Sequence, residues 1–207
     1  MRPKHLTYAP TAADSNGIGE SQSAVDAANL DIDGVLTADG VATLDIPRHV
    51  SITSDGDDSP RTFTVTGTDR YGATLTESIV GPNATTANGT KNFKTVTSIH
   101  INGATTGNIT MGTADAFESP ISPVGRYNIL THGVRLSSGA HLTHSVQYTV
   151  ENPFDPGFDE YSANWETSGG EQGANYSGKI DFPVGAVRLS VTNYIDGSVD
   201  SFDIVQV

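Results

Sequence analysis

From Arg61 to Phe93 the chain reads RTFTVTGTDRYGATLTESIVGPNATTANGTKNF, a stretch crowded with threonine and glycine. It contains two clean alternations of apolar and polar residues, in which Phe63 and Val65 share one face and Leu75 and Ile79 share another. Threonine suits a pleated surface, whereas glycine and asparagine favour the turns between strands. The stretch therefore predicts short antiparallel strands joined by turns, with Gly72 at one tip.

The same pattern continues on both sides of this stretch. Strands are expected at residues 41–46, 49–53, 62–67, 74–80, 92–101 and 107–112. A spacing of roughly 10 to 15 residues with turn residues between the strands is typical of a β-sandwich or barrel.

The second half of the chain carries the strongest period-two signal. The segment 140–150 should place Leu142, Val146, Tyr148 and Val150 on one face, with His144 interrupting. The segment 186–195 should do the same with Val187, Leu189, Val191 and Ile195. Residues 198–207 should form the last strand, so the chain is predicted to be all-β.

Proline and composition divide the chain into parts. Residues 1–35 are polar and poorly patterned, which predicts an extended N-terminal arm with at most a short helix near residues 23–32. Pro120 and Pro123 stiffen a connector at residues 119–125. We therefore expect two antiparallel β-sandwich-like domains at residues 36–118 and 126–207.

Charge and composition exclude several classes of function. The net charge is −13, from 24 acidic and 11 basic residues, and such a surface repels nucleic acid and anionic membranes. The absence of cysteine excludes disulfides, thiolate chemistry and cysteine-bound zinc. The start of the sequence has no apolar run of signal-peptide length, which predicts a protein folded in a cytoplasm.

Candidate metal sites are few. His141 and His144 form an H-x-x-H pattern, but odd spacing in a strand sends the two rings to opposite faces. Asp55, Asp57 and Asp58 resemble part of a calcium loop, yet the further ligands and the terminal glutamate are missing. An acidic β-turn is the better interpretation, and no metal or cofactor is predicted.

Catalytic patterns are equally sparse. Asp155, Asp159 and Glu160 form a carboxylate cluster of a kind that acidic β-proteins often contain, which makes a glycosidase or other hydrolase the weakest interpretation. The sequence has no G-x-S-x-G and no phosphate-binding loop. We therefore predict no catalytic residue and no enzymatic activity.

Interaction is the more promising interpretation. In the arm, the basic start contrasts with the acidic residues that follow it. A long acidic loop, residues 151–183, carries aromatic residues that could stack on a sugar or pin the loop to its own sandwich or to a neighbouring subunit. The predicted interaction residues are Arg2, Lys4, His5, Tyr8, Phe154, Phe158, Tyr161, Trp165 and Tyr176.

Residues 61–115 resemble a segment of structural proteins of tailed bacteriophages. The pattern runs through Thr-Val-Thr-Gly-Thr-Asp, Leu-Thr-Glu, Gly-Pro-Asn and Phe-Lys-Thr-Val-Thr-Ser to Ile-Thr-x-Gly-Thr-Ala. Residues 46–59 fit directly before this segment, and residues 145–155 and 182–207 resemble the second half of such proteins. The resemblance covers residues 40–207 loosely and is one of strands and turns, so it implies no catalytic residues.

The resemblance implies a virion component made in the host bacterial cytoplasm. Its expected role is that of a capsid decoration or cement protein that binds the major capsid protein or other virion proteins, with a homo-oligomer as one form. A tail or head–tail junction component is the alternative within the particle. A carbohydrate-binding β-sandwich that uses Trp165 and nearby tyrosines is the alternative from another class.

Overall fold

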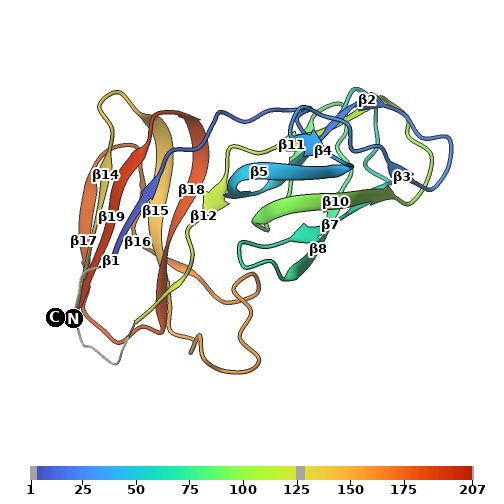
Figure 1. The fold of residues 1–207 in the computed structure, drawn as a ribbon. Helices are drawn as coiled ribbons and strands as arrows, with labels where there is room; N and C mark the ends of the chain where they lie inside the picture. Colours follow the sequence, from blue (N-terminus) through green and yellow to red (C-terminus); the bar gives the residue numbers. More distant parts are fainter. Residues whose placement is uncertain (1–3, 125–128, 207) are drawn as a thin grey trace. The chain divides into compact units, whose positions relative to one another are not determined.

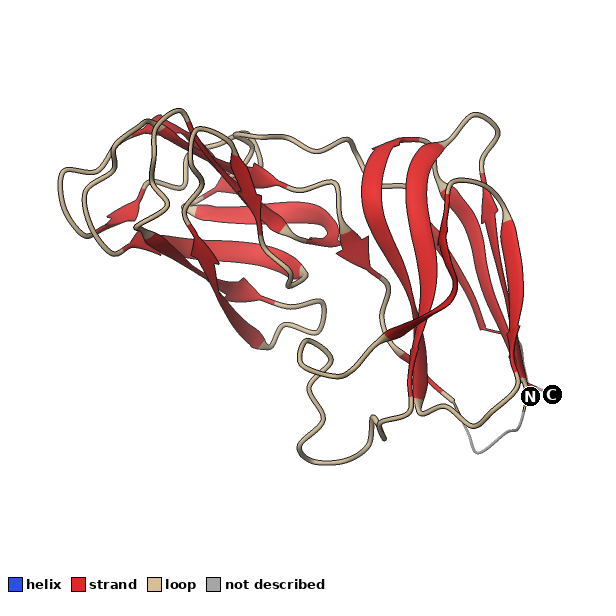
Figure 2. Cartoon of the chain, turned by 180° about the vertical axis from the view of Figure 1, so that it is seen from behind, coloured by secondary structure: helices blue, strands red, loops and turns tan. Residues whose placement is uncertain are grey.

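The computed structural model describes residues 4–124 and 129–206, and the described residues form strands, turns and loops but no helix (Figure 2). The prediction of an all-β chain built from antiparallel sheets is therefore confirmed. The chain divides into two compact units, with unit 1 formed by residues 1–12 and 118–207 and unit 2 by residues 13–117. None of the described residues belongs to a helix able to span a membrane.

Unit 2 consists of two antiparallel sheets. Its strands are β2 (Gly19–Gln22), β3 (Ala28–Leu30), β4 (Thr37–Ala38), β5 (Val41–Arg48), β6 (Val50–Ser54), β7 (Thr62–Thr68), β8 (Thr74–Val80), β9 (Thr86–Asn88), β10 (Phe93–Ile101) and β11 (Ile109–Thr113). One sheet has the order β4-β5-β10-β7-β8 with β3 also on β10, and the other has the order β2-β11-β6-β9.

The stretch quoted at the outset forms the β7–β8 hairpin of unit 2. Phe63 lies opposite Ile79 and Val65 opposite Glu77, and the apolar members of these pairs are buried. The turn begins at Asp69, whose carboxylate accepts the backbone N–H groups of Tyr71 and Ala73. Gly72 at the tip has φ +81°, a conformation that residues with a Cβ rarely adopt.

Unit 1 also consists of two sheets. Its strands are β1 (Lys4–Tyr8), β13 (Ser122–Pro123), β14 (Leu130–Leu136), β15 (His141–Thr149), β16 (Glu166–Gln172), β17 (Tyr176–Ile180), β18 (Ala186–Asp196) and β19 (Val199–Gln206), and β12 (Phe117–Glu118) begins at the last residue of unit 2. The sheet orders are β1-β19-β14-β17 and β12-β18-β15-β16, with β13 also on β18. Figure 1 shows β1 and β19, from opposite ends of the chain, side by side.

Residues 1–35 do not form one arm in the structure. Residues 4–8 pair with β19 in unit 1, whereas residues 13–35 belong to unit 2 and supply β2 and β3. Ile18 and Leu30 are buried there, and a Cβ on Gly112 would collide with the carbonyl of Asp14. Polar composition suggested an arm, but backbone pairing with distant strands holds these residues in place.

Two apolar residues of unit 1 face the opposite way from their predicted direction. In β18, Thr192 is an extra residue in the pairing with β15, because Asn193 lies opposite Thr143 and Val191 opposite His144. Such a bulge reverses the inward and outward alternation of a strand. Tyr194 is consequently buried, and Ile195 is exposed. Val150 lies just beyond the end of β15 and is 70% exposed.

Candidate interaction surface

The predicted interaction residues do not form one cluster. Arg2 lies outside the described residues, while Lys4, His5 and Tyr8 belong to β1. Four of the aromatic residues lie in the loop between β15 and β16, and Tyr176 begins β17. Only Phe154 among the predicted aromatic residues is largely exposed, at 76%.

Trp165 is held against the sandwich of unit 1. The guanidinium carbon of Arg188 lies 4.2 Å from the centre of the Trp165 ring, and the indole Nε1 donates to the carbonyl of Glu160 at 2.9 Å. Arg188 itself donates from Nε to Gln147 and from Nη1 to the Glu160 carbonyl. One face of the indole ring is thus covered, and the ring fastens the loop to β15 and β18.

Carboxylates and amides give the loop its shape. Asp159 Oδ1 accepts the N–H of Tyr161, and the Asp159 carbonyl accepts the N–H groups of Ser162 and Ala163. Asn152 Oδ1 accepts the N–H of Phe154, and its amide donates to Asp155. Two members of the predicted carboxylate cluster, Asp155 and Asp159, therefore shape turns, as short polar side chains often do.

Arg188→Ala is expected to free this loop from the sheet. The change removes the cation–π contact and the hydrogen bonds of the guanidinium to Gln147 and Glu160, at a cost of about 1–3 kcal/mol to the docking of the loop. Since Trp165 is the only tryptophan, its emission should shift to longer wavelength, and limited proteolysis should cut the chain between residues 151 and 165. Arg135→Ala, on an exposed residue of β14, should change neither; equal cleavage of both variants would contradict the role of Arg188.

Tyr176 faces the inside of unit 1. Its ring centre lies 5.7 Å from that of His132, and its hydroxyl passes so close to Gly169 that a Cβ there would collide with it. His132 is 3% exposed, and its Nε2 lies 2.9 Å from Ser168 Oγ. This histidine–serine pair connects strands of the two sheets, and Ser168 is only 9% exposed. We therefore interpret the pair as a structural contact.

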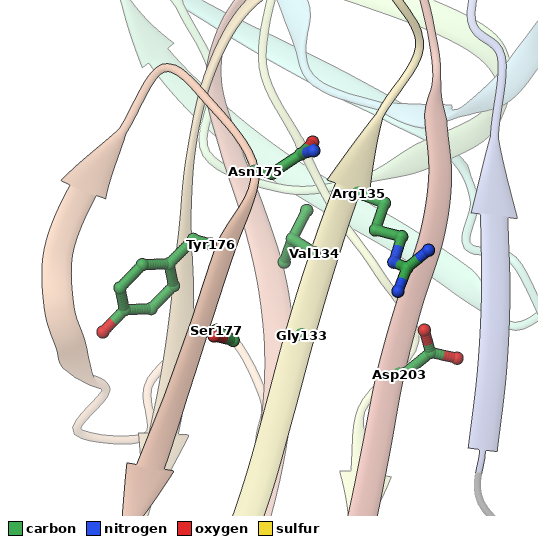
Figure 3. A pocket seen from close by; sticks show the side chains of 7 residues that line it. All are labelled: Gly133, Val134, Arg135, Asn175, Tyr176, Ser177 and Asp203. Carbon is green, nitrogen blue, oxygen red and sulfur yellow. The ribbon is translucent and has the colours of Figure 1, made fainter.

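The outer face of the first sheet of unit 1 carries a shallow polar hollow (Figure 3). Gly133 lies in the floor of this hollow, and a Cβ at this position would contact almost nothing. Arg135 and Asp203 lie along one side, and the Tyr176 ring points away from them. Without an aromatic face turned towards it, the hollow lacks the stacking surface that sugar binding uses.

The acidic turn in unit 2 is part of the structure rather than an ion loop. Asp58 is fully buried, and its carboxylate accepts from Ser54 Oγ at 2.6 Å and from the N–H groups of Thr106 and Gly107 at 2.7 and 3.3 Å. Asp55 accepts from the backbone and the side chain of Asn108, and these hydrogen bonds lower the pKa of its carboxyl group. Within the part of the chain that the structure describes, no three His, Asp or Glu side chains gather as metal ligands.

An exposed apolar surface lies at one end of unit 1. A hollow of about 400 Å³ has a wall of mixed polarity, to which Val150, Pro153, Phe154 and Pro183 contribute apolar side chains. Beside Pro183, Phe182 is 44% exposed and packs edge-on against the Tyr148 ring, with 5.3 Å between ring centres. We define Val150, Pro153, Phe154, Phe182 and Pro183 as the apolar surface.

Most of the apolar surface could not be found from sequence alone. Phe154 was predicted as an interaction residue, but Val150 was predicted to face inward. Phe182 and Pro183 are the last residues of the predicted loop 151–183, in which the structure instead forms β16 and β17, and they carry no motif. The one available signal was the clustering of aromatic and proline residues at both ends of the long loop.

Carboxylates lie beside the apolar surface along the chain. Glu151, Asp155 and Asp181 are exposed neighbours in the sequence. Glu151 accepts the N–H of Asn164, and Asp181 lies 2.7 Å from Lys179 Nζ. Exposed apolar residues rimmed by polar ones commonly mark an interaction site.

No family model, curated protein or solved structure matches this chain.

Proposed function

We propose that this protein is a non-enzymatic structural component of a tailed-phage virion, which decorates or cements the capsid by binding the major capsid protein. The observation that carries the proposal is the apolar surface of unit 1, with Val150 70% and Phe154 76% exposed. Exposed apolar residues that gather at one place commonly mark a contact with another protein. The resemblance of residues 40–207 to phage structural proteins is the reason for proposing that this contact lies in a phage particle.

The arrangement of unit 1 suits such a contact. The loop that carries Phe154 is held by Arg188 and Trp165 and by its own turns, so little ordering entropy is lost on binding. The carboxylates beside the apolar surface favour a partner with basic residues around an apolar one. They also disfavour a symmetric contact between two copies, in which like charges would meet.

The first test asks whether the chain is in the particle. Quantitative mass spectrometry of purified phage that encodes this chain should find it in many copies, at a fixed ratio to the major capsid protein. Separated heads and tails should give the signal in heads. Particles without the chain would overturn the proposal, and a signal confined to tails would transfer the role to the tail or the head–tail junction.

The second test locates the contact on the apolar surface. The double change Val150→Ser and Phe154→Ser should lower binding to particles that lack the chain by about 10–100-fold, because exposed anchors of this kind contribute on the order of 1 kcal/mol or more each. Val25→Ser, at a valine of unit 2 that is 97% exposed, is the matched control and should bind normally. Unchanged binding of the double variant would exclude this surface as the contact.

A carbohydrate-binding role is not favoured by the same residues. Its expected platform was Trp165 with nearby tyrosines, but Arg188 covers one face of the indole ring and Tyr176 turns towards the interior. A glycan array on the purified chain tests this alternative directly, and binding that is lost in Trp165→Ala while the fold survives would restore it.

A further inference from the structure

The first strand of the chain completes a sheet that is otherwise made from the last ninety residues. β1 lies at the edge of the sheet β1-β19-β14-β17 and has β19 as its neighbour in that order. The rest of unit 1 comes from residues 118–207, so all of unit 2 lies between β1 and its partner along the sequence. Such a strand joins its sheet by pairing with a segment at the far end of the chain, so the same segment of a second copy can take its place.

β1 is held mainly by backbone pairing and by contacts near the surface. Lys4, His5 and Leu6 lie opposite Ile204, Asp203 and Phe202, and a bulge follows before Tyr8. The described residues of β1 alternate between half-buried and exposed, and none of them is fully buried, whereas Phe202 and Ile204 of β19 are. The strand therefore contributes no fully buried side chain of its own to the core of unit 1.

Charge favours this strand over an unrelated one. His5 Nδ1 lies 2.7 Å from Asp203 Oδ1, with both side chains substantially exposed. Lys4 brings positive charge to an edge where β19 carries Asp200 and Asp203. In a chain of net charge −13, a basic segment at the N-terminus is the natural partner for that edge.

Residues 9–12, which would be the hinge if β1 left its sheet, are anchored at Pro10. Ala9, Thr11 and Ala12 are exposed, and Pro10 between them is buried, with its carbonyl accepting the Tyr194 hydroxyl at 2.6 Å. A hollow lies beside the segment, lined by Thr7, Tyr8, Ala9, Ser198, Val199 and Asp200. Proline favours an extended backbone, which suits a strand that reaches away from its own unit.

We propose that β1 exchanges between copies of this chain, so that β1 of one copy pairs with β19 of a second copy. The exchanged strand makes the same backbone pairs and the same His5–Asp203 contact as the intrachain strand, so the exchange changes little except the freedom of the hinge. High local concentration, as on the surface of a particle, favours the exchanged form. This inference is independent of the proposed function, because it concerns the chain alone.

The absence of cysteine permits a direct test by crosslinking. His5→Cys and Asp203→Cys are made in separate full-length chains, which are mixed in equal amounts and oxidised gently. A disulfide between residues 5 and 203 of different chains forms only when β1 of the first chain reaches β19 of the second. Non-reducing electrophoresis and peptide mass spectrometry should find this heterodimer at least about tenfold above the control pair, Val25→Cys with Asp203→Cys.

A second measurement uses the unmodified chain. Sedimentation analysis from micromolar to millimolar concentration should show dimers or longer assemblies. An unmodified chain that stays monomeric throughout, or a mixture that crosslinks no more than the control pair, overturns the exchange.

Discussion

Asp58→Ala is expected to lower the free energy of unfolding of unit 2 by about 2–4 kcal/mol. Asp58 is fully buried, and the change removes the acceptor for Ser54 Oγ and for the N–H groups of Thr106 and Gly107. Ser54 is buried, so its hydroxyl keeps the full cost of its lost hydration, whereas Thr106 is exposed and Gly107 is half-buried. Asp58→Asn keeps the shape but turns an amide N–H₂ towards donors, so it should recover only part of the loss.

The effect should be largest in the loop that Asp58 holds. Hydrogen exchange should speed up first at residues 104–108, where Asp55 also accepts from Asn108. Asp57→Ala is the matched control, because Asp57 is exposed and bonds only locally to Ser59 among the hydrogen bonds of this turn. Equal thermal midpoints for Asp58→Ala and Asp57→Ala would contradict the structural role of Asp58. They would instead favour a role for this turn in binding a ligand.

Acidification is expected to destabilise unit 1 at a higher pH than the pH at which its carboxylates become protonated. His144 is fully buried with no hydrogen-bond partner on either ring nitrogen, and burial lowers its pKa. Burial also lowers the pKa of His132 to about 4. As the pH falls through about 6.5, these histidines become protonated in the unfolded chain but stay neutral in the folded unit. The stability of unit 1 therefore decreases progressively until the histidines of the folded unit are protonated as well.

The loss from His132 alone is at most about 3 kcal/mol when fully developed. The emission of Trp165, the only tryptophan, reports on unit 1, and its thermal midpoint should fall by on the order of 10 °C between pH 7 and pH 4.5. The exposed pairs His5–Asp203 and His141–Asp196 contribute at lower pH. In each pair the histidine lowers the pKa of the aspartate, and the stabilisation from the pair is lost only as the carboxylate becomes protonated.

His144→Leu should flatten this dependence, because leucine fills the site without a group that takes up protons. His141→Asn is the control at the exposed end of the same strand and should leave the slope between pH 6.5 and 4.5 unchanged. Identical pH profiles for the wild-type and His144→Leu chains would show that His144 contributes no measurable part of the slope.

The two histidines of the H-x-x-H pattern illustrate what local pattern can predict. Odd spacing predicted opposite directions, and in the structure His141 is exposed while His144 is buried. The alternation also placed His144 on the same face as Leu142 and Val146, and the structure buries all three side chains. What local sequence did not encode is that neither ring nitrogen of His144 finds a hydrogen-bond partner, because that depends on the sheet packed above it.

The domain boundary shows the same division between local and non-local information. Pro120 and Pro123 marked a connector at residues 119–125, and the structure changes unit between Phe117 and Glu118. The second crossing, between Ala12 and Ala13, had no marker, because a five-residue edge strand with mixed polarity looks like an arm. Its membership of unit 1 depends on β19, which lies nearly two hundred residues away in the chain.

By itself the sequence determined that this protein is built from antiparallel strands, because alternating apolar residues with threonine, glycine and asparagine satisfy local rules that need no distant partner. Tertiary structure decided which face of each strand is buried near a bulge, where β1 belongs, and that Val150 and Phe154 reach the surface. Those outcomes depend on pairing between segments far apart in the chain, where one extra residue, Thr192, turns Ile195 outward and Tyr194 inward.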